Sequence, residues 1–143
     1  MKIKILLCLM VLGISTATAS GKTNPNKNYN VSSASLIEGY TQAKTTYDAN
    51  LLSALLHEDV VMRTGRQNQV LKHGKSELIR FYKQNPNVKL NCVTSCEMLS
   101  VCYNVVMARV DLQFPNFVQQ NYLTMERNNK GEWKITQINM FYI

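Results

Sequence analysis

The chain has 143 residues, with 16 Lys or Arg against 9 Asp or Glu and a net charge of +7. That length suits one domain with a single core. The basic residues are scattered, with no block of five like charges and no aromatic–basic alternation that would form a stacking platform, so we expect no nucleic-acid partner.

The first nineteen residues have the features of an export signal. Lys2 and Lys4 precede an apolar run over 5–14, and Ala17-Thr18-Ala19 offers a small-residue cleavage site. The apolar run is shorter than the ~20 residues that a membrane helix needs. We therefore predict cleavage after Ala19, no membrane anchor after cleavage, and a periplasmic or secreted protein. The remaining 124 residues (143 minus 19) carry a net charge of +5 (14 basic minus 9 acidic).

Residues 20–31 are polar and Asn-rich, contain Pro25, and include nothing that could build a core. They predict a flexible leader ahead of one folded domain, 32–143.

Two helices are predicted to open this domain. Ser32 or Ser33 can cap a helix that runs to about Tyr47, and Asp48 can cap a second helix over about 49–56. In the first helix, apolar residues recur at spacings of three and four and so share one face: Leu36, Ile37, Tyr40, Ala43 and Tyr47.

A short β-branched strand follows at Val60–Thr64, with a turn at 65–68 and a possible antiparallel mate at 70–72. A third helix is predicted from Gly74 to about Gln84. Glu77 stands in the capping-box position of that helix, and Asn85-Pro86-Asn87 ends it.

The rest of the chain predicts strands, at 88–101, 105–114, 118–128 and 132–143, with a hairpin turn at Asn129-Lys130-Gly131. In the second of these, Ala108, Val110, Leu112 and Phe114 alternate with the polar residues Arg109, Asp111 and Gln113. Helices followed by an antiparallel meander predict an α+β domain with segregated elements.

Three cysteines remain after the signal, Cys92, Cys96 and Cys102, so at least one thiol is free or intermolecular. On one strand, Cys92 and Cys96 would lie roughly 13 Å apart, too far for a disulfide or a tight metal pair. Cys96 and Cys102 could close across a hairpin, and small buried apolar residues are the default for all three. Motifs for zinc, flavin, nucleotide and haem are missing, so we expect no cofactor and no metal.

The helix–strand–loop–helix order of Ser53–Tyr82 and the ending Lys130-Gly131-Glu132-Trp133-Lys134-Ile135 resemble the NTF2-like superfamily, which includes SnoaL-like and ketosteroid-isomerase-like proteins. The resemblance covers about 33–143. It implies a cone-shaped α+β fold, in which a curved antiparallel sheet packs on the N-terminal helices and leaves an apolar pocket at the open end. It also implies a homodimer through the outer face of the sheet, which the apolar ending Phe141-Tyr142-Ile143 would suit.

In ketosteroid isomerases a tyrosine of the first helix donates a hydrogen bond to the substrate oxyanion, eight residues before an aspartate, the spacing of Tyr40 and Asp48 here. The resemblance therefore implies that Tyr40 is a pocket residue, and a core tyrosine is the alternative. The isomerase general base is replaced by Thr64, which has no pKa near neutrality, and the second acid has only the displaced Glu126 to match it. Steroid isomerase chemistry is thus disfavoured.

Two residues remain as catalytic candidates, Asp111 and His73. By analogy with the kinase association domains of this superfamily, Asp111 and Thr124 fall at pocket positions, whereas on the residues alone Arg109 and Asp111 could equally form an ion pair on the exposed face. A carboxylate in a partly dry cavity would have a raised pKa and could act as acid or base. His73, just before the third helix, is the one credible acid–base histidine.

These observations favour an exported protein that binds a small, mostly apolar ligand, rather than an enzyme. One alternative is a lyase or isomerase with a non-standard set, in which Asp111 is the base, Tyr40 the oxyanion donor and His73 the acid. Another is a dimerisation module with a vestigial pocket. The predicted ligand-binding residues are Tyr40, Tyr47, Met62, Phe81, Asp111, Tyr122, Thr124 and Met140.

Overall fold

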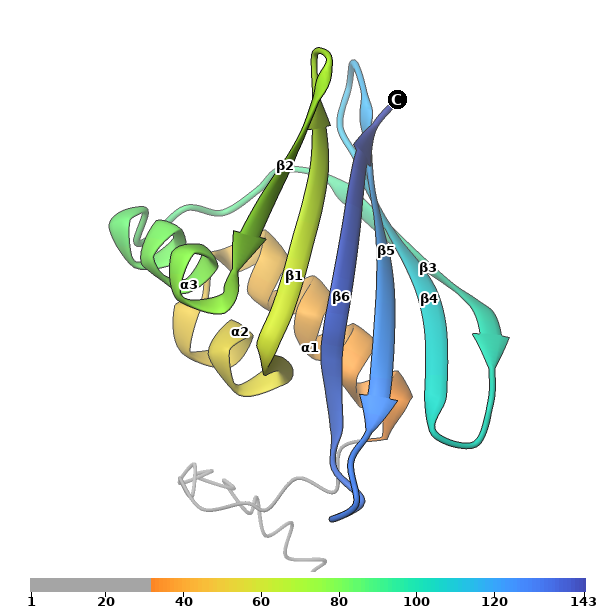
Figure 1. Cartoon of the computed structure of the whole chain (residues 1–143). Coiled ribbons are helices and arrows are strands. Elements are labelled where there is room, and N and C mark those ends of the chain that lie inside the picture. The colour runs from red at the N-terminus through yellow and green to blue at the C-terminus, as the bar shows by residue number, and fades with distance from the viewer. Residues whose placement is uncertain (1–31) are drawn as a thin grey trace, which may run out of the picture.

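The computed structural model describes residues 32–143, so the predicted export signal and polar leader lie outside the described residues. Three helices and six strands follow one another along this part of the chain (Figure 1). Their bounds are α1 (Ser33–Thr46), α2 (Ala49–Leu55), β1 (Leu56–Arg66), β2 (Gln69–Gly74), α3 (Lys75–Gln84), β3 (Val93–Val101), β4 (Val105–Gln113), β5 (Val118–Arg127) and β6 (Trp133–Tyr142).

The first two helices begin and end at the residues that the sequence marks. The Ser32 hydroxyl accepts a hydrogen bond from the Ser35 amide (3.2 Å), and an Asp48 carboxylate oxygen accepts one from the Leu51 amide (2.9 Å). Between the two helices Tyr47 takes a left-handed conformation (φ 54°), and its amide donates to the carbonyl of Ala43. This turn lets α2 fold back against α1.

The strands form one sheet in the order β2-β1-β6-β5-β4-β3. Every neighbouring pair is antiparallel except β1 and β6, which run parallel. The last strand of the chain therefore lies inside the sheet, between β1 and β5 (Figure 1). The predicted α+β architecture is confirmed, and the β1–β6 pair makes the sheet mixed.

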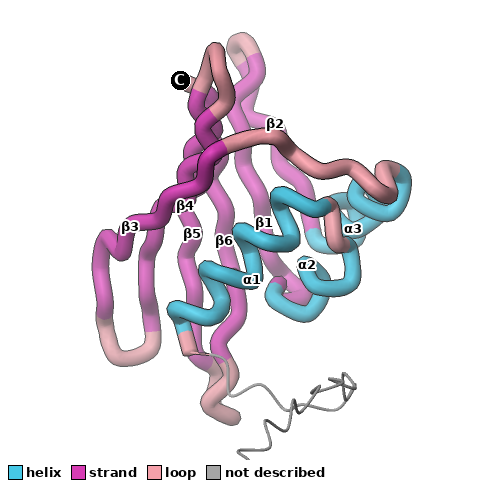
Figure 2. Tube along the Cα trace, turned by 180° about the vertical axis from the view of Figure 1, so that it is seen from behind, coloured by secondary structure: helices cyan, strands magenta, loops and turns pink. Residues whose placement is uncertain are grey.

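All three helices lie on the same face of this curved sheet (Figures 1 and 2). The inward side chains of β4 and β5 pack under α1 and are fully buried, among them Ala108, Val110, Leu112, Leu123 and Met125. Burial of such apolar surface supplies the main stabilising term of the fold.

Gly39 brings α1 close to α2. A Cβ atom at this position would stand only 3.1 Å from a Leu55 methyl carbon, nearer than most side-chain contacts allow. The absence of a side chain at Gly39 thus sets the spacing of the two helices.

After α3 the chain crosses from the β2 edge of the sheet to the β3 edge, over residues 85–92 (Figure 2). The Leu90 amide donates to the carbonyl of Thr45 (2.8 Å), which fastens this crossing to the end of α1. Strand β3 then forms the far edge of the sheet, and all nine of its residues are exposed.

The three described cysteines are free thiols, and Cys96 and Cys102 are exposed, whereas small buried residues were expected. Both belong to the β3 edge or the turn after it, which no helix covers. Within residues 32–143, no helix combines the length and the apolar character needed to cross a bilayer.

Candidate functional site

A cavity of about 320 Å³ lies between the helices and the inner face of the sheet. Its walls come from α1, α2, α3 and the strands β1, β2, β5 and β6. The lining residues are Tyr40, Lys44, Tyr47, Leu52, Met62, Thr64, His73, Glu77, Leu78, Phe81, Tyr82, Gln119, Ile138, Met140 and Tyr142. Most of this lining is apolar or aromatic, with a small number of polar groups.

Helix α1 supplies one wall because Tyr40, Lys44 and Tyr47 follow one another at spacings of four and three, which places them on one face. The left-handed turn at Tyr47 accompanies a stacked contact between its ring and that of Tyr82, with ring centroids 4.8 Å apart and planes 20° apart. Phe81 lies 5.9 Å from Tyr47 in a tilted arrangement. Three aromatic rings thus form one side of the cavity.

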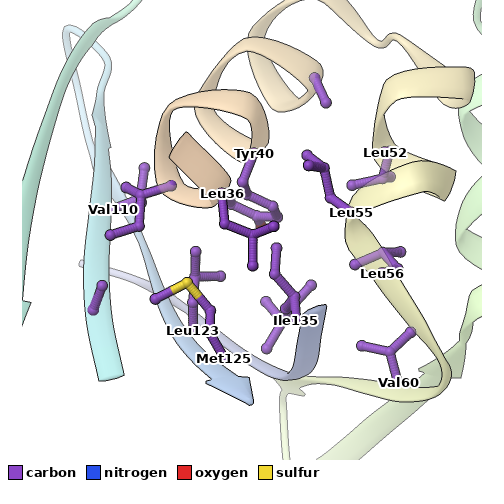
Figure 3. Close-up of a cluster of buried hydrophobic side chains, with 14 of the residues drawn as sticks. Leu36, Tyr40, Leu52, Leu55, Leu56, Val60, Val110, Leu123, Met125 and Ile135 are labelled. Atoms are coloured by element: carbon purple, nitrogen blue, oxygen red, sulfur yellow. The ribbon is translucent and has the colours of Figure 1, made fainter. Parts of the chain in front are cut away.

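Tyr40 reaches the floor of the cavity and is 2 % exposed. Its ring lies among Leu36, Leu55 and Ile135 of the core (Figure 3). The hydroxyl donates to the side-chain oxygen of the buried Asn121 (3.1 Å). Burial raises the pKa of Tyr40 well above its usual value, so the hydroxyl stays protonated. Its proton is already engaged by Asn121, which leaves Tyr40 without the free donor that an oxyanion site needs.

Lys44 brings a positive charge to the same wall. Its ammonium lies 3.9 Å from the sulfur of Met140, and no carboxylate within residues 32–143 forms an ion pair with it. Burial lowers the pKa of Lys44 to about 8. Of the residues that line this cavity, Lys44 alone is a lysine or arginine.

Gln119 lies at the start of β5 and is 8 % exposed. Its amide nitrogen donates to the hydroxyl of Tyr142 (2.9 Å), whereas its oxygen Oε1 is buried with no hydrogen-bond partner among the described residues. The Tyr142 hydroxyl also lies 3.9 Å from the Met140 sulfur, so Gln119, Tyr142 and Lys44 meet around one methionine.

His73 and Glu77 face each other across the junction of β2 and α3. The His73 Nδ1 atom lies 2.8 Å from a Glu77 carboxylate oxygen, and both side chains border the cavity. This contact orients the imidazole ring at the edge of the cavity.

Five of the eight predicted ligand-binding residues border the cavity, namely Tyr40, Tyr47, Met62, Phe81 and Met140, as does the catalytic candidate His73. Asp111, Tyr122 and Thr124 do not. They belong to the alternate set of β4 and β5, because Val110, Leu112, Asn121 and Leu123 take the inward positions.

The placement of Asp111 in a dry pocket was therefore wrong. Its Oδ2 atom lies 3.1 Å from the Arg109 Nε on the outer face of the sheet, and Arg109 also contacts Glu97 at 3.1 Å. The carboxylate of Asp111 raises the pKa of the Arg109 guanidinium above its usual value. The structure instead matches the alternative given by the sequence, in which Arg109 and Asp111 form an ion pair on the outer face.

Sequence reasoning did not assign Lys44, Gln119, Asn121 or Tyr142 to the site. Lys44 stands four residues after Tyr40, and that helical spacing was a usable signal. Gln119 and Asn121 precede Leu123 and Met125 at alternate positions of β5, which marks them as inward. Polar residues in an inward set are a sign of a binding site.

Within residues 32–143, His, Cys, Asp and Glu side chains do not gather in threes or more around a point that could hold an ion.

Many solved structures have a similar shape, among them three from bacteria, whose low sequence identity means that they show the fold alone. An NTF-2 like protein of unknown function from Silicibacter pomeroyi has a TM-score of 0.65 and 16 % identity, over 77 % of this chain and 92 % of that chain. An NTF2-like protein from Shewanella baltica has a TM-score of 0.67 and 9 % identity, over 77 % and 90 %. A protein described as a "putative ketosteroid isomerase" from Parabacteroides distasonis has a TM-score of 0.56 and 19 % identity, over 82 % and 93 %.

A search of curated protein sequences finds no significant match. The model of the family described as "Putative lumazine-binding" matches residues 30–142, nearly the whole described domain. The chain therefore belongs to this family, and its fold is that of the NTF2-like superfamily.

Proposed function

We propose that the protein is exported and binds a small, largely apolar molecule in the cavity between the helices and the sheet. The observation that carries this proposal is the lining, in which aromatic rings, Leu78, Ile138 and two methionines surround a few polar groups. Its volume of about 320 Å³ falls at the lower end of the range of about 300–1,000 Å³ for small-molecule sites. The description of the family, which speaks of lumazine binding, is in keeping with a small ligand.

The stacked wall favours a ligand with a flat face. Tyr47 and Tyr82 lie parallel to within 20°, and Phe81 stands beside them at 5.9 and 6.1 Å. Aromatic groups gain energy from offset stacking or edge contacts with such rings beyond the gain from burial. The sulfur atoms of Met62 and Met140 add polarisable contacts on the sheet side.

Binding is better supported than turnover. The Tyr40 hydroxyl donates its hydrogen bond to Asn121, and Asp111 lies on the other face of the sheet, so two of the three groups of the lyase or isomerase hypothesis are not available to a molecule in the cavity. The pair of His73 and Glu77 is the remaining group that could exchange a proton there.

Export is proposed from the first nineteen residues. Lys2 and Lys4, the apolar run and the Ala17-Thr18-Ala19 site support it. The mass of the protein purified from its host tests it, because cleavage after Ala19 leaves a chain that begins at Ser20.

We also propose a homodimer through the outer face of the sheet. Phe141 is 51 % exposed there and packs edge-on against Tyr122 (5.6 Å), and Met107 is 40 % exposed on β4. The Asp111 oxygen Oδ1 is buried without a hydrogen-bond partner among the described residues, although its residue lies on this outer face. Tyr142, by contrast, turns to the cavity, so Phe141 is the residue of the C-terminal tail that faces the proposed partner.

The binding proposal is tested by filling the cavity from the sheet side. Met62→Trp places a large ring in the cavity and is expected to weaken binding of the neutral fluorescent probe N-phenyl-1-naphthylamine at least tenfold relative to the wild type. Val70→Trp, at a residue 64 % exposed near the β1–β2 turn, is the matched control and should bind as the wild type does. Equal affinity of the two variants would contradict the proposal. Mass spectrometry of the intact protein from its host, under native conditions, would then identify a retained ligand.

A further inference from the structure

The cavity holds two polar groups whose bonding capacity the protein itself does not use. One is the Lys44 ammonium, which lies against a methionine sulfur and forms no ion pair within residues 32–143. The other is the Gln119 oxygen Oε1, buried and without a partner there. Unused polar groups inside a cavity cost free energy, so a fold that retains the half-buried Lys44 ammonium and the buried Gln119 oxygen in one such cavity points to a ligand that completes them.

The two groups lie at the same end of the cavity. The Lys44 nitrogen and the Tyr142 hydroxyl both lie 3.9 Å from the Met140 sulfur, and the Tyr142 hydroxyl accepts a hydrogen bond from Gln119 at 2.9 Å. The stacked rings of Tyr47 and Tyr82 form another part of the wall. The cavity thus combines an aromatic wall with a positive charge and a hydrogen-bond acceptor.

Neither group is explained by a role within the fold. Lys44 stands in the last turn of α1, where a lysine can bond the final carbonyls, yet the contact of its ammonium is with Met140. The acid that borders the cavity, Glu77, is bonded to His73 at 2.8 Å and is not paired with Lys44.

We propose that the ligand is an acidic molecule with a flat ring, whose anionic oxygen pairs with Lys44 and whose N–H or O–H group donates to Gln119 Oε1. This inference rests on the proposed function and narrows it to one ligand class. An ammonium in a largely apolar cavity forms a strong, charge-assisted hydrogen bond with a carboxylate, and this bond gives the acid a higher affinity than a neutral molecule of the same shape.

Three probes with one ring system test it. 2-Naphthoate carries an anion and no donor, 2-naphthamide carries donors and no charge, and 2-acetylnaphthalene carries neither. Calorimetric titration of the wild type at pH 6.5 should give about 10- to 100-fold tighter binding of the naphthoate than of the acetylnaphthalene. The naphthamide should bind about 3- to 10-fold tighter than the acetylnaphthalene.

Two variants separate the two contacts. Lys44→Met should abolish the preference for the naphthoate and keep that for the naphthamide, and Gln119→Met should do the reverse. Lys72→Met, at an exposed lysine of β2 outside the cavity, should change neither preference. Thermal unfolding of each variant verifies that it is folded, and the ranking of the probes by the wild type does not depend on any variant.

The naphthoate preference should also depend on pH. Because the pKa of Lys44 is about 8, the free protein loses this positive charge above that pH. Between pH 6.5 and 9.5 the affinity for naphthoate should fall about 10- to 30-fold, while that for acetylnaphthalene stays level. The other titratable groups around the cavity are Tyr40, Tyr47, His73, Glu77, Tyr82 and Tyr142, so Lys44→Met, which should remove the pH dependence, identifies the group responsible.

The outcomes separate this inference from the proposed function. Binding of acetylnaphthalene with no preference for naphthoate or naphthamide would overturn the inference and leave the binding function in place. A loss of preference in Lys72→Met equal to that in Lys44→Met would also overturn it. Absence of binding by all three probes would overturn both proposals.

Discussion

Lys44 carries a positive charge into an environment that disfavours it. Burial lowers the pKa of its ammonium from about 10.5 to about 8, which means that the folded protein holds the charged form at a cost. A residue that costs stability and has no partner in the fold is typical of a binding site.

Lys44→Met should therefore raise the free energy of unfolding at pH 7 by about 1–3 kcal/mol, less than the full equivalent of the shift because Lys44 keeps some contact with water. Between pH 8 and about 10.5 the unfolded wild type binds more protons than the folded one, so wild-type stability rises with pH there. The difference in free energy of unfolding between Lys44→Met and the wild type is therefore full below pH 8 and vanishes above about 10.5. Urea unfolding of both proteins across this range measures it.

The wild type and Lys44→Met must be compared at each pH, because the buried tyrosines lower the stability of both proteins at high pH while deprotonation of Lys44 raises that of the wild type. Burial raises the pKa of Tyr40, Tyr47 and Tyr82, so above about pH 10 the unfolded state loses their protons first and both proteins lose stability. A less stable Lys44→Met variant at pH 7 would show instead that the ammonium stabilises the C-terminal end of α1.

At the scale of single residues, the sequence predicts which side chains of β4 are buried, but it does not predict which residues of β4 and β5 face the cavity. Ala108, Val110 and Leu112 are buried as their alternation predicts. On β5 the inward set is Gln119, Asn121, Leu123 and Met125, and the outward set contains Tyr122 and Thr124. Thr124 was placed in the pocket by analogy with the kinase association domains and Tyr122 for its aromatic ring, and neither placement used the alternation along β5.

Among the elements, α2 is the shortest helix of the described domain and depends most on its ends. It has seven residues, too few to be stable on propensity alone, and it buries Leu52 and Leu55 while Leu52 also borders the cavity. The hydrogen bond from the Leu51 amide to the Asp48 carboxylate satisfies one of the free amides at its start.

Asp48→Ala should lower the free energy of unfolding by about 1 kcal/mol, since it removes this cap. For a domain of this size the melting temperature should fall by about 4 °C. Asp59→Ala, at a carboxylate 93 % exposed, is the matched control and should change the melting temperature little. A scanning calorimeter measures both, and equal melting temperatures for the two variants would contradict the assigned role of Asp48.

Most helices and strands could be predicted because their signals are local. The helix caps at Ser32 and Asp48 bond amides only three residues away, and the alternation that predicts β4 lies within the strand itself. The parallel pairing of β1 with β6 was not predicted, because it joins residues that lie more than seventy positions apart, such as Val61 and Gln137, and no local pattern encodes it.

For the whole molecule, the outer face of the sheet is the surface through which we propose the dimer. The three helices cover the inner face only (Figure 2). Met107 and Phe141 are 40 % and 51 % exposed on the outer face, where Phe141 packs against Tyr122. Exposed apolar side chains that gather on one face favour association, and a two-fold dimer closes such a face on itself.

Phe141→Glu should convert the proposed dimer to a monomer, because it places a buried charge at the two-fold contact. Sedimentation velocity of the mature protein, compared with that of the wild type, measures the change in mass. Val70→Glu, at an apolar residue of the β1–β2 hairpin that is 64 % exposed, should leave the dimer intact. A monomeric wild type would contradict the dimer proposal and leave the binding proposal standing.

The interior position of β6 has a consequence for how the domain folds. The strand that joins β1 to the rest of the sheet is the last of the nine described elements along the chain, so the β1–β2 hairpin and the β3–β5 meander stay unconnected until β6 docks between them. Because the core cannot close without this strand, a chain that lacks β6 should expose the apolar inner face of both parts of the sheet.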